Sequence, residues 1–193
     1  MAMSGLSSIA SPQEQAIGDL ALILFFYLLR VGEYTQKRRK ASTRTIQFRY
    51  CDIAFNKGNI LIPPTAPAAL IIEATAATLR LSNQKNGIRG AMIHRSCMKG
   101  EFCPVKEISR RFLHMRENNT HVNEIISSFW DHLGVGHVND DDMRKGIRRA
   151  VTVLGLEKHG ILPSRVGTHS FRDGGAMALK FAGAKPMDVK VER

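Results

Sequence analysis

Two residues toward the end of the chain have the types and the spacing expected of a phosphate-binding site. His169 and Arg172 are three residues apart in the sequence GTHSFRDGGA, residues 167–176. In a helix that starts near His169, both side chains would lie on one face, beside the helix N-terminus. A guanidinium, an imidazole and N-terminal backbone N–H groups would then converge on one point, which suits an anionic oxygen, most often of a phosphate. On its own, such a pair is more often the capped, solvated start of a helix.

The net charge favours a polyanionic partner. The 193 residues contain 28 Lys and Arg against 17 Asp and Glu, a net charge of +11. A charge of this size favours nucleic acid first and an acidic membrane second, although a basic protein without such a partner stays open. The hydrophobic content of 44% argues against general disorder and fits one well-buried core.

The cysteines and the longest apolar run argue against a secreted or membrane protein. Cys51, Cys97 and Cys103 form no even disulfide framework, so we expect a reducing, intracellular location in the nucleus or cytoplasm. The spacing of His94, Cys97 and Cys103 matches no standard zinc pattern, and we expect no metal site. The run at 20–29 is ten residues long, half of what a membrane span needs, and predicts a buried helix.

The first helix is expected to deliver a cation to the edge of the core. After a loose arm at 1–10, the sequence SPQE at 11–14 is typical of a helix start, with Ser as cap and Glu at the third position. We expect the helix to run to about Val31 and to stop at Gly32. Arg30 lies at its far end, where a snorkelling side chain or a partner of the helix dipole is the alternative interpretation.

A small antiparallel sheet is expected in the first half of the chain. Alternating residues at 46–50 and a short run at 59–62 flank a turn at 56–58, and runs at 78–82 and 91–94 flank an Asn-Gly hairpin turn. Lys57 lies in the first turn, and Lys85 is expected at the tip of the second.

The second half of the chain is expected to be helical. One helix should cover 104–117, with Glu107 and Arg111 as an i,i+4 pair and a basic outer side. That outer side would carry Arg110, Arg111 and Arg116. Another helix should run through Leu154, capped by the aspartates at 140–142, with Ile147, Val151 and Leu154 facing inward. The expected fold class is therefore α+β, mostly helical, with a small antiparallel β-sheet.

Taken in order, these motifs resemble the catalytic domain of the tyrosine recombinases, the phage-integrase-like family. LLRVGEY at 28–34 resembles the first arginine motif, LSNQKNGIRG at 81–90 the β-hairpin lysine segment, and HSFRDGGA at 169–176 the His-x-x-Arg box. The Gly-Gly-Ala after the arginine is similar to the branch carried by eukaryotic mobile elements. The resemblance covers about residue 15 to the end and implies a DNA breaking-rejoining fold.

By this resemblance, the catalytic residues would be Arg30, Lys85, His169 and Arg172, with Lys57 a second choice for the lysine. In the family, a tyrosine attacks a DNA phosphodiester and forms a 3′-phosphotyrosyl link, without metal or cofactor. The two arginines would stabilise charge on the phosphate, and removing one such donor would raise the barrier by about 3 kcal/mol. Lys85 would act as general acid and His169 as the acid/base partner of the nucleophile.

The resemblance also implies double-stranded DNA as the partner, no membrane, and a possible homo-oligomer on DNA. The charge run Lys37, Arg38, Arg39 and Lys40 follows the first arginine motif, where a DNA backbone could pass, and Arg89 adds a cation to the hairpin. The function implied is DNA binding with recombination or integration by strand transfer.

The chain departs from the family pattern after the His-x-x-Arg box. The family places a His or Trp box and then the tyrosine nucleophile there, whereas this sequence ends at Arg193. Tyr27, Tyr34 and Tyr50 are expected in a core helix, a turn and a strand, so none is a credible nucleophile. We therefore expect 11–193 to be a catalytic domain that lacks its C-terminal end, and to bind DNA without cleaving it. A non-catalytic DNA-binding remnant and an unrelated RNA- or ribosome-associated protein are the alternatives.

Overall fold

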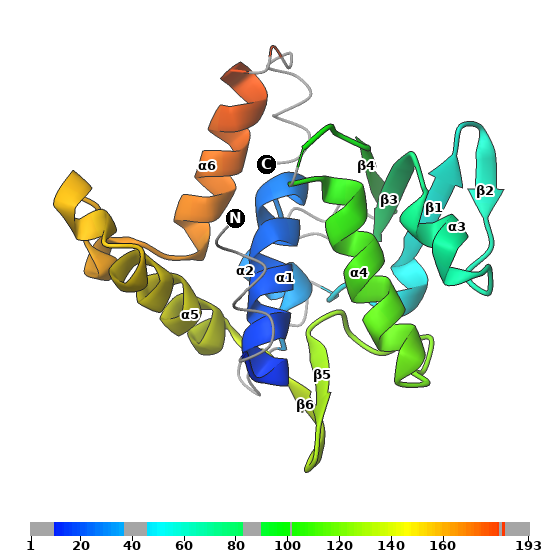
Figure 1. The fold of residues 1–193 in the computed structure, drawn as a ribbon, viewed down its shortest axis with the longest axis horizontal. Coiled ribbons are helices and arrows are strands. Elements are labelled where there is room, and N and C mark those ends of the chain that lie inside the picture. Colours follow the sequence, from blue (N-terminus) through cyan, green and yellow to red (C-terminus); the bar gives the residue numbers. More distant parts are fainter. Residues whose placement is uncertain (1–9, 37–45, 83–89, 101, 182, 184–193) are drawn as a thin grey trace.

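The described part of the chain has an α+β fold with a small antiparallel sheet, the class expected from the sequence (Figure 1). The computed structural model describes residues 10–36, 46–82, 90–100, 102–181 and 183. The α-helices are α1 (Pro12–Tyr27), α2 (Val31–Tyr34), α3 (Ala68–Ile72), α4 (Pro104–Glu117), α5 (Asp140–Val153) and α6 (Thr168–Phe181). Short 3-10 helices are η1 (Tyr50–Asp52), η2 (Leu156–His159) and η3 (Pro163–Arg165). None of these helices is long and apolar enough to cross a membrane.

Two antiparallel sheets accompany the helices. The strands are β1 (Ile53–Lys57), β2 (Ile60–Ile62), β3 (Ala76–Leu81), β4 (Ala91–Ser96), β5 (Ser128–Asp131) and β6 (Gly134–His137). The first four form one sheet in the order β2-β1-β3-β4, and the last two form a separate hairpin. The second predicted hairpin is present as the pair β3 and β4, with Leu79 opposite Ile93. The predicted turn at 56–58 lies between β1 and β2, with Phe55 opposite Ile62, but β1 is not the strand expected at 46–50.

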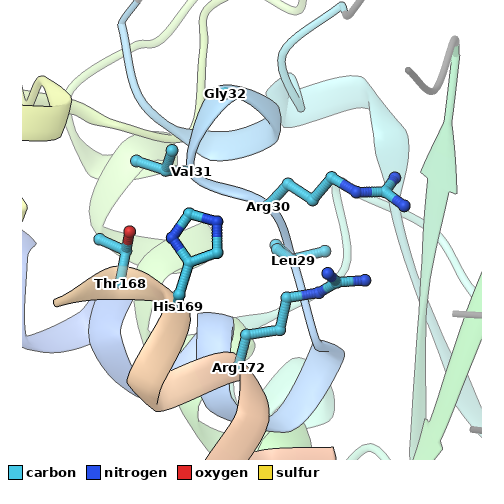
Figure 2. A pocket seen from close by; sticks show the side chains of 7 residues that line it. All are labelled: Leu29, Arg30, Val31, Gly32, Thr168, His169 and Arg172. Carbon is cyan, nitrogen blue, oxygen red and sulfur yellow. The ribbon is translucent and has the colours of Figure 1, made fainter. Parts of the chain in front are cut away.

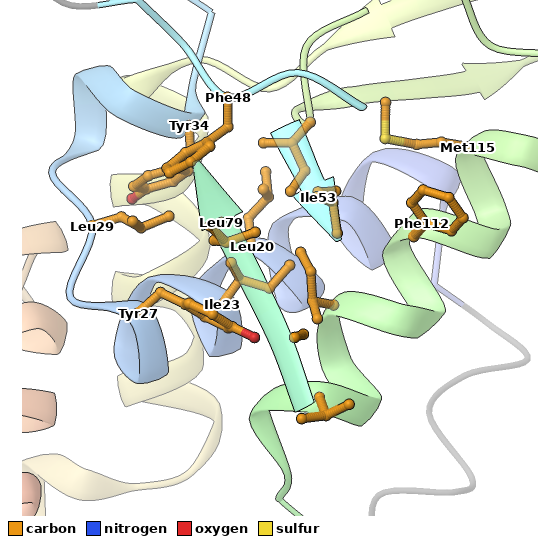
Figure 3. Packing of buried hydrophobic residues seen from close by; sticks show 14 of the residues in the cluster. Leu20, Ile23, Tyr27, Leu29, Tyr34, Phe48, Ile53, Leu79, Phe112 and Met115 are labelled. Carbon is orange, nitrogen blue, oxygen red and sulfur yellow. The ribbon is translucent and has the colours of Figure 1, made fainter. Parts of the chain in front are cut away.

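Helix α1 is the element around which the described chain is built. Its N-terminus has the predicted capping box, in which Ser11 and Glu14 satisfy each other's backbone N–H groups. The helix packs against α4 on one side and against α5 and α6 on the other (Figure 1). Leu20, Ile23 and Tyr27 are fully buried in the main core, next to residues of the sheet and α4 (Figure 3).

The end of α1 differs from the prediction. The helix ends at Tyr27, not near Val31, because Leu28 adopts a left-handed backbone conformation with φ of 53°. Such a conformation costs a non-glycine residue roughly 1–2 kcal/mol. Burial of the Leu28 side chain, which is 2% exposed, offsets that cost. As a result Gly32 lies inside α2, and Arg30 leads into α2 from an extended backbone.

The predicted strand at 46–50 is also absent from the described residues. The backbone N–H of Phe48 donates to the carbonyl oxygen of Glu33 at 2.7 Å, and the Phe48 carbonyl oxygen accepts from Ile126 at 2.9 Å. These bonds tie the segment to α2 and to the loop before β5, and β1 begins only at Ile53. The apolar residues alternate with polar ones at 46–50 because Phe48 is buried between other elements, and not because one face of a strand is buried.

Three predicted details of the later helices are wrong. Arg111 does not lie on the outer side of α4: it is 1% exposed and its guanidinium donates to the carbonyl oxygens of Ile126 and Ser128. Glu107 consequently pairs with Arg110. Leu154 ends α5 and is 66% exposed, so it does not face inward.

Helix α5 is capped by Asn139, and not by the first aspartate of its acidic run. The Asn139 side chain accepts hydrogen bonds from the backbone N–H groups of Asp141 and Asp142. From α5 the chain passes through η2 and η3 into α6, which stands against α1 on the side away from the sheet (Figure 1).

Candidate phosphate-binding site

A pocket lies where the end of α1 meets the start of α6. Its volume is about 300 Å³, and its lining residues are Leu29, Arg30, Val31, Gly32, Thr168, His169 and Arg172 (Figure 2). Arg30 and the two residues of the His-x-x-Arg box, far apart in the sequence, therefore line one pocket. Their roles in catalysis stay predictions.

Arg30 is held at the pocket by a buried carboxylate. Its backbone N–H donates to Glu33 at 2.7 Å, and its guanidinium Nη1 donates to the same carboxylate at 3.3 Å. The Glu33 side chain is 4% exposed and that of Arg30 is 26% exposed. Since a guanidinium carries five N–H donors in a fixed fork, this ion pair fixes the group while other donors still reach the pocket.

Arg172 is held by the backbone at the end of α1. Its Nε–H donates to the carbonyl oxygen of Leu28 at 2.7 Å. The left-handed turn at Leu28 thus provides an acceptor for the arginine of α6. Figure 2 shows the side chains of Arg30 and Arg172 extending toward the same side of the pocket, with both guanidinium groups at one end.

His169 and Thr168 bring the N-terminus of α6 to the pocket. They are the first two residues of this helix of 14 residues, and His169 is exposed. The His169 ring points toward the segment of Arg30 and Val31 (Figure 2). The first backbone N–H groups of a helix lack intrahelical acceptors and carry partial positive charge, so they add to an electropositive site.

Gly175 allows α6 to approach α1 closely enough to form this pocket. A Cβ atom at Gly175 would lie 2.1 Å from the carbonyl oxygen of Phe25 and 2.8 Å from Cδ2 of Leu28. Neither the backbone of α1 nor the buried Leu28 can move aside cheaply. At Gly174 the nearest atom, on the Phe25 ring, would be 3.7 Å away, an ordinary contact. Only the second glycine of the Gly-Gly pair is therefore required by this packing.

The structure does not place every predicted site residue. Lys85, Arg89 and the basic run Lys37, Arg38, Arg39 and Lys40 fall outside the described residues. Lys57, the second choice for the lysine, is not in the pocket lining: its ammonium pairs with Glu73 at 2.7 Å beside the β1–β2 turn. This geometry gives Lys57 no support as a catalytic group.

One arginine that supports the site was not predicted from the sequence. Nε–H of Arg95, on β4, donates to the carbonyl oxygen of Phe26 at 2.8 Å, and its guanidinium lies 5.8 Å from the centre of the Tyr27 ring. Arg95 and Arg172 thus hold two carbonyl groups at the end of α1, one from the sheet and one from α6. A single basic residue just after a predicted strand gave no signal of this contact.

The three tyrosines of the sequence lie in or against the core and not in the pocket. Tyr27 and Tyr34 are fully buried, and burial raises the pKa of both phenols well above the usual value. The Tyr27 hydroxyl donates to the carbonyl oxygen of Pro104 at 3.4 Å. The ring of Tyr50 stacks on Phe112 at 4.4 Å, and burial also raises its pKa. None of these hydroxyls is placed to attack a group in the pocket.

In the part of the chain that the structure describes, no cluster of three or more His, Cys, Asp or Glu side chains could hold a metal ion. The charge that faces the pocket comes from the protein's own cations. The described residues of the pocket can bind and polarise an anionic oxygen, and no tyrosine is among them.

Comparisons with known proteins give no family for this chain. No protein-family model, no curated protein and no solved structure matched it. The functional interpretation therefore depends on the geometry of the pocket and on the resemblance of the motifs.

Proposed function

We propose that this chain binds duplex DNA and holds one backbone phosphate between Arg30, His169 and Arg172. The observation that carries the proposal is the shared pocket, which is lined by His169 at the start of α6 and by two arginines whose guanidinium groups are each fixed by an acceptor, Glu33 or the Leu28 carbonyl. A phosphodiester presents two non-bridging oxygens, which match two guanidinium forks. The net charge of +11 favours the same partner.

Strand transfer of the tyrosine-recombinase type is the reaction that the resemblance implies, and the two arginines and the histidine of the pocket would serve it. The two arginines would hydrogen-bond the non-bridging oxygens as charge grows on the phosphorus centre, and His169 would accept or return a proton. Lys85 would protonate the leaving 5′ oxygen. The proposed fold is accordingly that of a DNA breaking-rejoining catalytic domain, acting on DNA in the nucleus or cytoplasm.

The nucleophile is not among Tyr27, Tyr34 and Tyr50, because all three are held in or against the core. We therefore expect the 193 residues to bind DNA and not to cut it. In a recombinase, a tyrosine from outside this sequence would act on the bound DNA and carry out strand transfer. A DNA-binding remnant would bind DNA and receive no such tyrosine. The exposed side chains of Met177 and Phe181 on α6 offer a surface for a further segment or a second copy on DNA.

Two assays test the proposal. Affinity for a duplex DNA and for an RNA duplex of the same length, measured at one salt concentration, separates DNA binding from the RNA-associated alternative. Incubation with a nicked suicide substrate, followed by denaturing electrophoresis, reports covalent adducts. We expect tighter binding to DNA and no adduct. Preference for RNA would contradict the DNA assignment, and an adduct abolished by changing one of the three tyrosines to Phe would contradict the account of the nucleophile.

A further inference from the structure

Two cysteines outside the pocket lie close enough to react with each other. Sγ of Cys97 is 3.4 Å from Sγ of Cys103. Cys97 follows the end of β4, and Cys103 immediately precedes α4. A disulfide bond is about 2.05 Å long, so a shift of little more than ~1 Å would bring the two sulfurs to bonding distance.

The two thiols differ in how they can be reached. Cys97 is exposed, whereas Cys103 is fully buried. The backbone holds both in place: the Cys97 N–H donates to the carbonyl oxygen of Thr75 at 2.7 Å, and the Met98 N–H donates to Sγ of Cys103 at 3.3 Å. A soluble oxidant would therefore meet Cys97 first, with Cys103 already beside it.

We propose that Cys97 and Cys103 are a redox modification site, which a low-molecular-weight disulfide such as glutathione disulfide converts reversibly to an intramolecular disulfide. The Cys97 thiolate attacks one sulfur of glutathione disulfide and expels one glutathione thiolate. The Cys103 thiolate then attacks Sγ of Cys97 and expels the second. The protein loses two protons and two electrons, and one glutathione disulfide becomes two glutathione molecules.

Accessibility places Cys97 first, and the electrostatics favour the second step. Burial by itself would raise the pKa of the Cys103 thiol. Hydrogen bonds from the backbone N–H groups of Lys106, Met98 and Val105 and from the Cys97 thiol together outweigh it, so the pKa lies below the usual value. The hydrogen bond to Cys103, followed by burial, raises the pKa of Cys97. Cys103 is thus the better resolving thiolate, and the first step at Cys97 is expected to be the slow one.

The disulfide would join two elements that hold the end of α1. Arg95 on β4 donates to the carbonyl oxygen of Phe26, and Tyr27 donates to the carbonyl oxygen of Pro104 at the start of α4. A bond between Cys97 and Cys103 would tie these supports together. Intracellular disulfides are usually transient and redox-sensing, which fits a reversible bond in a chain expected in a reducing compartment.

The test uses the full chain, reduced and then equilibrated with buffers of increasing glutathione disulfide to glutathione ratio. Samples are quenched with acid, free thiols are alkylated, and the protein is cut with trypsin. Because Lys99 separates the two cysteines, the disulfide would link the peptides 96–99 and 100–106. We expect this linked pair, a decrease of about 2 Da in the mass of the intact chain, and Cys51 alkylated as before. The melting temperature should rise by about 5 °C and return after reduction.

Single substitutions separate the two steps. In Cys103→Ser, Cys97 should remain as a mixed disulfide with glutathione, whereas in Cys97→Ser the buried Cys103 should take up no glutathione. Cys51→Ser is the matched control and should form the linked peptides unchanged. The proposal would be overturned by a stable mixed disulfide at Cys97 in the unsubstituted chain, by a disulfide that includes Cys51, or by three free thiols at the most oxidising ratio.

Discussion

The Nε–H of Arg172 donates to the carbonyl oxygen of Leu28 at 2.7 Å, across 144 residues of sequence. Leu28 offers this carbonyl because its backbone turns into the left-handed region and ends α1. The same turn sends the chain back past α6, so that Arg30 comes to line the pocket with Arg172. One unusual backbone conformation thus positions both arginines.

Arg172→Lys should weaken DNA binding although the charge is kept. A lysine ammonium cannot both hold the Leu28 carbonyl and present a planar fork to a phosphate. We expect the affinity to fall about tenfold, near the value of one hydrogen bond to a charged group. Fluorescence anisotropy with a labelled duplex measures it. An affinity equal to that of the parent chain would mean that the fork of Arg172 does not contact DNA.

Gly175→Ala should disrupt the packing of α6 on α1. The new methyl group would collide with the Phe25 carbonyl oxygen, so we expect stability to fall by about 1–3 kcal/mol or more and DNA binding to weaken. Gly174→Ala is the matched control. It adds a methyl group at an open helical position and should be neutral or stabilise the protein by about 0.5–1 kcal/mol. Urea unfolding compares the two, and equal stability would contradict the close approach of α6.

Several elements of the fold are predicted by local signals in the sequence. The start of α1, the pair β3–β4, the turn before β2 and α4 follow from a capping box, turn residues and helical spacing, all of which are local. The end of α1 could not be predicted in this way. Leu28 adopts a left-handed backbone conformation because its side chain is buried, and no glycine indicates the turn. The His-x-x-Arg box gave the start of α6, but its contact with Arg30 rests on tertiary packing at Gly175.

The prediction for Arg111 failed for the same reason. Its position on α4 predicted an exposed side chain. The guanidinium instead donates hydrogen bonds to two buried carbonyl groups, one before β5 and one at its start. Burial lowers its pKa to about 10. Only the three-dimensional position of the hairpin β5–β6 shows that these acceptors exist.

Arg111→Met should therefore destabilise the protein. It leaves the buried carbonyl oxygens of Ile126 and Ser128 without these donors, at a cost of about 3 kcal/mol. Arg149→Met removes an arginine whose side chain is 73% exposed and pairs with Glu14 at the surface, so its cost should stay below about 1 kcal/mol. Chemical denaturation measures both. A decrease in stability that is no larger in the Arg111 variant would refute a structural role for this residue.

Stability should fall on mild acidification, partly through His114. Burial, followed by the charge of Arg111, lowers the pKa of His114 below its ordinary value of 6.5. Between the ordinary pKa of about 6.5 and the lower pKa of folded His114, the unfolded state binds a proton that the folded state does not. Stability therefore decreases as pH falls below about 6.5. His114→Gln should flatten the dependence of unfolding free energy on pH between about 7 and 5.5. His159→Gln, a change at an exposed histidine, is the control, and equal slopes in both variants would exclude His114 as the cause.

The most direct test of the phosphate pocket is the salt dependence of DNA binding when both pocket arginines are changed. Arg30→Gln with Arg172→Gln is compared with Lys57→Gln plus Arg80→Gln, which removes the same charge from the sheet. Circular dichroism first checks that both variants are folded. If the pocket holds backbone phosphate, the slope of log K against log salt should become shallower by about 0.9 for each phosphate that the variant no longer neutralises, and affinity should fall well below that of the control pair. Equal slopes and affinities in the two double variants would contradict the pocket as the DNA-binding site.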